Sequence, residues 1–262
     1  MISPYWKARI ARDLTNLSLL RQSGTHWLRH MLSVLMARLY DLPEPVHLQD
    51  SDFIPSPKQA SKYSGILRIV SSHAIASPLL TNRLALAFVC LPRYLLLVRD
   101  PRIILASHYQ REKSRYNISF SEYLRADLAA LHKAGTRRRF DKDIWWDIRF
   151  QNSWAKMLAL MPEQMRLVRY EDLRRDTAGQ LADIARFLGL PEAGAEDLAY
   201  AIAQSSKEAM SKKEAPGAKY TVVRKDEANP LAAYSDEDKR FFLQTYRKYC
   251  RADFGYDLEA GW

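Results

Sequence analysis

The chain has 262 residues, 47% of them hydrophobic, so it can bury a substantial core as one large domain or at most two. Its net charge of +10, from 40 basic and 30 acidic residues, predicts attraction to polyanions such as nucleotides, sulfated or phosphorylated glycans, anionic lipids or nucleic acids. No apolar run reaches the roughly 20 residues of a membrane-spanning helix. The sequence therefore argues against stable membrane insertion.

The first residues and the two cysteines favour a cytoplasmic protein. Met1 to Asp13 form a basic and aromatic arm without the apolar core of a secretion signal. Cys90 and Cys250 lie far apart and lack CxxC spacing, which is typical of free thiols in a reducing compartment. We expect no metal site.

The stretch from Leu14 to Tyr40 organises the rest of the chain. Leu17–Leu20 is long enough for one buried strand, and residues 21–25 form a polar turn that contains a glycine. After this turn, apolar residues recur at helical spacing up to Leu39. A strand, a glycine-containing turn and a helix aim backbone N–H groups at one point, where phosphate is the usual ligand.

Two interpretations of this turn stay open at this point. The motif of ATP- and GTP-hydrolysing proteins, GxxxxGK[ST], is absent, so hydrolysis of a nucleoside triphosphate is a weak hypothesis. The turn either binds an anion or is an ordinary serine or threonine helix cap beside a glycine.

Two further strands end in polar residues. Ile66–Ser71 is a predicted strand with His73 just after it, which is either a structural histidine or a base at a ligand-binding strand end. Tyr94–Val98 is another, followed by Arg99 and by a helix that begins near Pro101. An arginine at a strand end can clamp a phosphate with charge-assisted hydrogen bonds.

The later chain continues the alternation of strands and helices. A proline-rich loop covers residues 43–64, and residues 111–140 are predicted to be helical and basic, either as a solvated face or as the rim of an acceptor site. The remaining predicted elements are a core helix over Asp143–Met161, a strand over Met165–Val168, and helices over Thr177–Leu190 and Asp236–Tyr249.

Ordered segments between Leu17 and Phe242 resemble the sulfotransferases that use 3′-phosphoadenosine 5′-phosphosulfate (PAPS). RQSGTHW at residues 21–27 is similar to the family's 5′-phosphosulfate loop, PKSGTTW. The strand that runs into His73, with Pro78 beyond it, resembles the segment K-T-H-L-P that supplies the catalytic base, although serines replace its Lys-Thr.

The most specific segment is RDPRIILASHY at residues 99–109. It keeps most of the family's 3′-phosphate motif, with Ile103 in place of the usual aspartate. YEDL at residues 170–173 is also similar to a family segment.

Two later segments match less completely. SSKEAM at residues 205–210 lies where the family has T-S-F-x-x-M, with lysine replacing the aromatic residue. Arg224-Lys225 align with the family's late R-K-G loop, but Asp226 replaces the glycine.

The resemblance implies a single α/β domain over residues 1–262, with a mostly parallel central sheet flanked by helices and a P-loop-like turn. It implies transfer of the sulfuryl group from PAPS to a hydroxyl or an amine, which leaves 3′-phosphoadenosine 5′-phosphate (PAP). His73 and Gln22 would be the catalytic residues. The implied cofactor-binding residues are Arg21, Gln22, Ser23, Gly24, Thr25, His26, Trp27, Arg99, Ser107, Tyr170, Ser205, Arg224 and Lys225.

Gln22 is the departure from the family pattern that matters most. The family usually has a lysine there, which neutralises the leaving group, whereas a glutamine amide carries no charge. Loss of such an electrostatic contact typically costs about 2.7–4 kcal/mol. Arg21 or Arg29 could substitute; otherwise the chain is a slow enzyme or a protein that binds the nucleotide without catalysis.

Hypotheses from two other classes also remain. One is a non-catalytic module that binds the desulfated nucleotide or an anionic glycan. The other is a nucleic-acid binder, which rests on charge alone because no nucleic-acid motif is visible, and we expect no such partner. The acceptor is not encoded in any recognisable motif; a small molecule, a carbohydrate or a glycolipid would fit.

Overall fold

The computed structural model describes residues 14–19, 23–78, 82, 91–116, 118–126, 143–214 and 229–262. In chain order the strands and helices are β1 (Leu14–Leu19), α2 (Thr25–Leu39), β2 (Arg68–Ser72), β3 (Tyr94–Val98), α4 (Pro101–Tyr116), α5 (Phe120–Arg125), α7 (Ile144–Leu160), the 3₁₀ helix η2 (Pro162–Gln164), β4 (Met165–Arg169), α8 (Tyr170–Arg175), α9 (Thr177–Leu188), α10 (Ala195–Gln204), α11 (Lys207–Lys212), the 3₁₀ helix η3 (Pro230–Ala233) and α12 (Asp236–Tyr249). No helix among these residues is long and apolar enough to cross a membrane.

The four strands form one parallel sheet in the order β2-β1-β3-β4. Leu14 pairs with Arg68 of β2, and Asn16 pairs with Tyr94 of β3, so β1 lies between these two strands. β4 extends the sheet from the other side of β3, with Tyr94 opposite Met165. The carboxyl ends of all four strands therefore lie at the same edge of the sheet.

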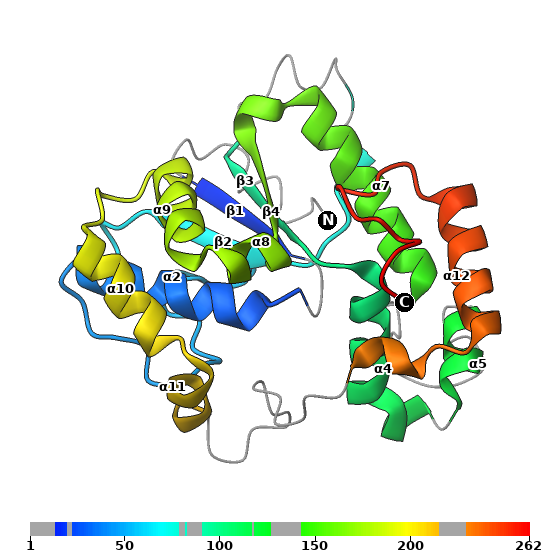
Figure 1. Cartoon of the computed structure of the whole chain (residues 1–262). Helices are drawn as coiled ribbons and strands as arrows, with labels where there is room; N and C mark the ends of the chain where they lie inside the picture. Colours follow the sequence, from blue (N-terminus) through cyan, green and yellow to red (C-terminus); the bar gives the residue numbers. More distant parts are fainter. Residues whose placement is uncertain are drawn as a thin grey trace.

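Helices cover both faces of the sheet, as the alternation of side chains along β3 shows. Leu95 and Leu97 pack into a core cluster with residues of α2, α9 and α10. Tyr94, Leu96 and Val98 pack into a second cluster with residues of α7. Figure 1 shows α2, α9 and α10 on one side of the sheet and α7 and α12 on the other. A strand with both faces buried is apolar throughout, which is why β3 reads as an uninterrupted apolar run.

The predicted α/β fold is confirmed, and the strand boundaries show what the apolar pattern misses. Tyr94–Val98 was predicted without error. β1 begins at Leu14 rather than Leu17, and β2 occupies Arg68–Ser72 rather than Ile66–Ser71. Backbone pairing between β1 and β2, which needs no apolar side chain, sets these limits.

The helix predictions hold with two corrections. α9 ends at Leu188 rather than Leu190, because Gly189 adopts the left-handed conformation that closes a helix, with a φ of 88°. Within residues 111–126 the helix is not continuous: α4 ends at Tyr116, and Ser119 caps the new helix α5. Residues 127–142 lie outside the described part of the chain. The core helix α7 was predicted correctly, since Trp146, Phe150 and Trp154 are buried.

Candidate functional site

Three strands lead directly into residues that the sequence predicts for the site. His73 follows β2, Arg99 follows β3, and Tyr170 follows β4 as the first residue of α8. Ser23 follows β1 after residues 20–22, which are not described. Because the strands are parallel, these residues gather at one edge of the sheet, where ligands of open α/β sheets bind. In the strand order, the turn after β1 lies between the ends of β2 and β3.

The turn after β1 ends in Gly24, which precedes the first residue of α2. Gly24 has a φ of 83°, a left-handed conformation that glycine adopts without strain. The N-cap position of α2 is this glycine, which has no side chain with which to cap the helix. The first N–H groups of α2, with the positive end of the helix dipole, keep the character of an anion site.

Tyr170 is the residue around which the predicted site assembles. A Cβ atom added to Gly24 would lie 2.5 Å from two carbons of the Tyr170 ring, so the turn and the ring are in close contact. The Arg99 guanidinium lies over the same ring, 4.4 Å from its centroid. Trp27 meets Tyr170 edge to face, with ring centroids 5.9 Å apart. The Trp27 indole N–H donates to the Ser205 carbonyl oxygen at 3.0 Å.

These contacts join five predicted residues from four separate parts of the chain. α2 supplies Trp27 and is preceded by Gly24, Arg99 comes from the end of β3, Tyr170 opens α8, and Ser205 follows α10. The sequence predicted each of them from its local segment, and the structure brings them together.

His26 is half-buried at the start of α2. Burial lowers its pKa to about 4, and the positive charges of Arg29 and Arg111 lower it further in the same direction. At neutral pH the imidazole is therefore uncharged and can serve as a hydrogen-bonding group. The Arg29 guanidinium donates to the carbonyl oxygens of Asp50 and Ile54, at 3.4 and 3.0 Å, so it is attached to the loop before β2.

Several buried polar atoms around this turn have no hydrogen-bond partner among the described residues. They are His26 Nδ1, Arg29 Nε and Ser205 Oγ. Buried polar atoms are almost always paired with protein or with ordered water, so a cluster of unpaired ones favours a ligand. These three atoms offer donors and a hydroxyl, which suit the oxygens of an anionic nucleotide. The residues present therefore fit the predicted cofactor.

The predicted 3′-phosphate motif divides into two parts in the structure. Arg99 faces Tyr170, and Ser107 is buried in the second turn of α4, as predicted. Arg102, in contrast, is held in a buried ion pair with Asp100, with Nη2 2.7 Å from the carboxylate. The same guanidinium donates to backbone carbonyls near the end of the chain. Arg102 therefore belongs to the fold rather than to the nucleotide site.

His73 lies just beyond β2 and is partly exposed. The segment that follows it is attached to α7: Trp154 donates to the Ala74 carbonyl oxygen at 3.0 Å, and the Ala76 N–H donates to Ser153 Oγ at 3.1 Å. This anchoring fixes the backbone of His73 at the edge of the sheet. Its placement suits a base that serves a ligand in the turn beside it.

The remaining predicted site residues lie outside the described part of the chain. They are Arg21, Gln22, Arg224 and Lys225. Their roles stay predictions.

The sequence interpretation placed Arg111 only within the basic stretch 111–140, as a solvated face or the rim of an acceptor site, and not beside the turn after β1. Arg111 lies close enough to His26 to lower its pKa, although the two residues come from different helices. Arg111 is four residues after Ser107, which places the two side chains on the same face of α4. This spacing from Ser107 could have indicated, from the sequence alone, that Arg111 lies near the site.

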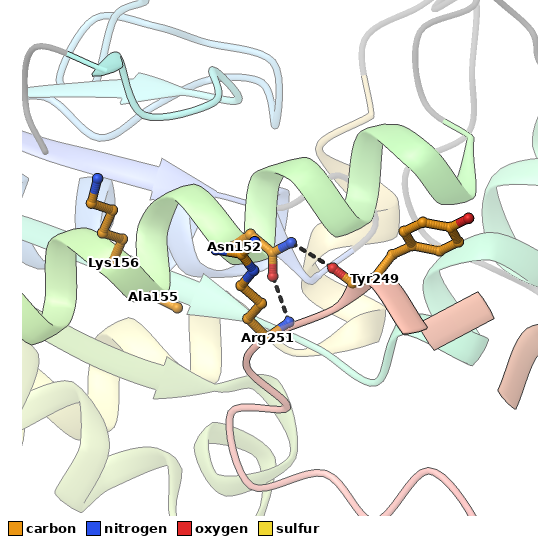
Figure 2. Close-up of a pocket in the computed structure, with 5 residues that line it drawn as sticks. All are labelled: Asn152, Ala155, Lys156, Tyr249 and Arg251. Atoms are coloured by element: carbon orange, nitrogen blue, oxygen red, sulfur yellow. Dashed lines mark hydrogen bonds between the residues drawn. The ribbon is translucent and has the colours of Figure 1, made fainter. Parts of the chain in front are cut away.

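A separate open pocket lies between α7 and the end of α12. Asn152, Ala155, Lys156, Tyr249 and Arg251 line it, as Figure 2 shows. Asn152 donates to the Tyr249 carbonyl oxygen at 2.8 Å and accepts from the Arg251 N–H at 2.7 Å, so it joins α7 to the end of α12. No predicted site residue contributes to this pocket.

Comparison with known proteins identifies the family. The model of the sulfotransferase domain family matches residues 17–245, most of the chain, and the chain therefore belongs to this family. No curated protein gives a significant match in sequence.

Solved structures share the fold at low identity. Mouse sulfotransferase SULT7A1 complexed with PAP is 17% identical, with a TM-score of 0.63, over 95% of this chain and 89% of that one. Retinol dehydratase in complex with androsterone and inactive cofactor PAP is 16% identical, with a TM-score of 0.57, over 97% of this chain and 88% of that one. Both are similar across nearly their whole length.

Proposed function

We propose that this member of the sulfotransferase family uses PAPS and transfers its sulfuryl group to a hydroxyl of an acceptor, with an amine as the alternative nucleophile. The acceptor class is a small molecule, a carbohydrate or a glycolipid. The similar structures of SULT7A1 and retinol dehydratase are both complexes with PAP, which supports the same nucleotide for this chain.

One observation carries the proposal: Gly24 and Arg99 both contact the ring of Tyr170 at the carboxyl edge of the sheet. A glycine turn at a helix start binds a phosphate, and an arginine at a strand end can clamp another. Because both groups contact the Tyr170 ring, one nucleotide could bind the turn with its 5′-phosphosulfate and Arg99 with its 3′-phosphate. The unpaired Ser205 Oγ, reached through Trp27, extends this site.

The roles of the residues follow from this arrangement. The N–H groups at the start of α2, with Ser23, Thr25 and His26, would hold the 5′-phosphosulfate. Arg99 and Ser107 would hold the 3′-phosphate, together with Arg224 and Lys225. PAPS when bound supplies an activated sulfuryl group, and the chain's task is to orient it and to stabilise the charge of the departing nucleotide.

His73 would accept the proton of the acceptor hydroxyl. An imidazole suits a general base, and His73 lies at the strand end next to the turn after β1. Removing this proton makes the acceptor oxygen a better nucleophile. This oxygen attacks the sulfur of PAPS on the side opposite the 5′-phosphate. The new S–O bond to the acceptor forms as the S–O bond to the phosphate breaks, and PAP departs.

An assay with radiolabelled PAPS tests the proposal, run against a panel of lipids, saccharides and phenols. We expect transfer to at least one class of acceptor, and micromolar affinity for PAP. A chain that binds oligonucleotides but not micromolar PAP would contradict the proposal.

His73→Ala is the informative variant, because it separates catalysis from binding. We expect turnover to fall about 10²–10⁴-fold, the usual contribution of a general base, while PAP affinity stays unchanged. His47→Ala is a matched control, since His47 is also a partly exposed histidine outside the helices and strands, between α2 and β2, and has no predicted role. Full activity of His73→Ala would remove this residue from the mechanism.

The second candidate function is a nucleotide-binding protein with impaired catalysis, favoured by Gln22 in place of lysine. Gln22→Lys distinguishes the alternatives. A rise in turnover of about ten-fold or more supports a slow enzyme, because the restored charge acts on the leaving group. No change supports rescue by a neighbouring arginine, and an absence of turnover in both forms with intact PAP binding supports the binding protein.

A further inference from the structure

The segment formed by residues 254–262 lies against two turns that carry proposed nucleotide-binding residues. It follows α12 and, in Figure 1, runs in red beside α7 toward the start of α4. Its contacts are with the turn after β3 and with the junction between β4 and α8. Arg99 is in the first of these turns, and Tyr170 is in the second.

Arg102 connects the 254–262 segment to the turn after β3. Its Nη1 donates to the carbonyl oxygens of Leu258 and Ala260, at 3.2 and 2.6 Å. The central carbon of the same guanidinium lies 4.8 Å from the centroid of the Trp262 ring. The remaining nitrogens donate to the Asp100 carboxylate. Both charged side chains are at most 10% exposed. Arg102 therefore links Asp100, the residue that follows Arg99, to the 254–262 segment.

Glu171 connects the segment to both turns at once. One carboxylate oxygen accepts the Asp100 N–H at 3.3 Å, and the other accepts the Tyr256 hydroxyl at 2.7 Å. Burial, with the Glu171 carboxylate as the next cause, raises the pKa of Tyr256, so its hydroxyl stays protonated and donates. Glu171 directly follows Tyr170, and Asp100 directly follows Arg99.

Arg169, on the other side of Tyr170, also contacts the segment. Its Nη1 donates to the Gly255 carbonyl oxygen at 3.0 Å, and its guanidinium lies 4.5 Å from the centroid of the Tyr256 ring. A Cβ atom on Gly255 would lie 3.1 Å from this nitrogen, and Gly255 has a φ of 81°, so a glycine suits the close approach. The segment thus holds the residues on both sides of Tyr170.

We propose that Tyr256, acting through Glu171, is a positioning residue for Arg99 and thereby for the 3′-phosphate of the nucleotide. The inference rests on the proposed function, since it concerns the same site. The Tyr256 hydroxyl fixes the Glu171 carboxylate, which fixes the backbone of Asp100 and the direction in which Arg99 leaves β3. None of the segment's residues needs to touch the nucleotide.

Tyr256→Phe tests this link, because it removes one hydroxyl and keeps the ring beside Arg169. We expect the dissociation constant for PAP to rise about five-fold, a typical effect of coupling through packed neighbours. Tyr200→Phe is the matched control: the Tyr200 hydroxyl also donates to a glutamate, Glu44, at 2.6 Å, and neither residue has a proposed role at the site. Calorimetric titration with PAP and thermal unfolding are measured for both variants.

A comparison of two nucleotides separates positioning from a merely structural effect. Adenosine 5′-phosphate lacks the 3′-phosphate, so Tyr256→Phe should weaken PAP binding more than binding of adenosine 5′-phosphate. Glu171→Gln should show the same selective loss, and the double variant should lose little more than either single one. An equal loss for both nucleotides, or PAP affinity unchanged relative to Tyr200→Phe, overturns the inference. Failure of the unaltered chain to bind PAP overturns the proposed function as well, and so the two failures are distinguishable.

Discussion

The turns after β1 and β3 both lead from the sheet into a long helix, but their buried polar atoms differ. At the first turn, His26 Nδ1 and Arg29 Nε have no hydrogen-bond partner among the described residues. At the second turn, every nitrogen of the Arg102 guanidinium donates to Asp100 or to carbonyl oxygens of residues 257, 258 and 260. The Arg102 guanidinium is thus satisfied within the chain, whereas the two atoms at the first turn can be satisfied by a ligand.

This difference shows that the hydrogen-bond partners of a charged side chain, rather than its residue type, indicate whether it binds a ligand or stabilises the fold. Unpaired buried polar atoms are costly, so they indicate a place that a ligand can satisfy. A buried charge with all its donors occupied contributes to the fold, and it is expensive to remove. The two arginines of RDPR differ in their surroundings: Arg99 faces the ring of Tyr170, and Arg102 faces the 254–262 segment.

The largest expected effect is at the buried ion pair of Arg102 in the turn after β3. Arg102→Ala leaves the Asp100 carboxylate buried without its partner, so we expect the free energy of unfolding to fall by about 3–5 kcal/mol. Denaturation by urea measures this loss. Arg186→Ala is the control, because Arg186 pairs with Asp183 at 2.8 Å on the surface and should cost about 1 kcal/mol or less. Equal losses in the two variants would show that Arg102 is not structurally special.

Local sequence patterns predicted the elements of this fold well, and the partners of charged residues poorly. The run Tyr94–Val98 specifies a strand buried on both faces, and Gly189 specifies a helix end, because each depends on local geometry and burial. Arg99 and Arg102 are three residues apart and chemically identical. Their different roles depend on Tyr170 and on residues 257–262, which are far along the chain, so no local pattern could separate them.

The second prediction tests the turn after β1. Gly24→Ala meets two costs: a positive φ, and a Cβ atom 2.5 Å from the Tyr170 ring. The ring must then move, which disturbs Arg99 and Trp27, so we expect PAP affinity to fall about ten-fold or more. Gly65→Ala is the control, because it introduces only the backbone strain. Gly65 has a φ of 85°, and no atom lies within 4 Å of an added Cβ.

Both alanine variants should lose about 1–2 kcal/mol of stability from the left-handed backbone. Only Gly24→Ala should lose PAP binding, measured by calorimetric titration. If the two variants bind PAP equally, the contact between the turn and Tyr170 does not shape the nucleotide site.

The candidate site shows the same division between local and distant information. The S-G-T turn and the arginine after β3 were recognisable from their own segments. The contact of Gly24 with Tyr170 was not, because residues 24 and 170 meet only through the sheet order β2-β1-β3-β4. The position of Arg111 was missed for a related reason: its spacing from Ser107 defines a helix face, but only the fold shows that this face approaches His26.

The smallest expected effect concerns the proton on His26. In the free protein its pKa of about 4 keeps the imidazole neutral, chiefly because the ring is buried. A phosphate bound at the start of α2 favours the charged form and raises this pKa, so PAP binding should be accompanied by proton uptake. By linkage, PAP affinity then gains strength as the pH falls from 7.5 toward 5.5, by less than about ten-fold.

His26→Asn separates this effect from the titration of the phosphates of PAP, which is common to both proteins. Calorimetric titration in two buffers of different ionisation enthalpy gives the number of protons taken up. We expect greater uptake in the unaltered chain than in His26→Asn at pH 5.5, and little difference at pH 7.5. If the unaltered chain and His26→Asn take up the same number of protons at both pH values, the nucleotide phosphate does not lie beside His26. The unpaired Nδ1 atom is then satisfied in some other way.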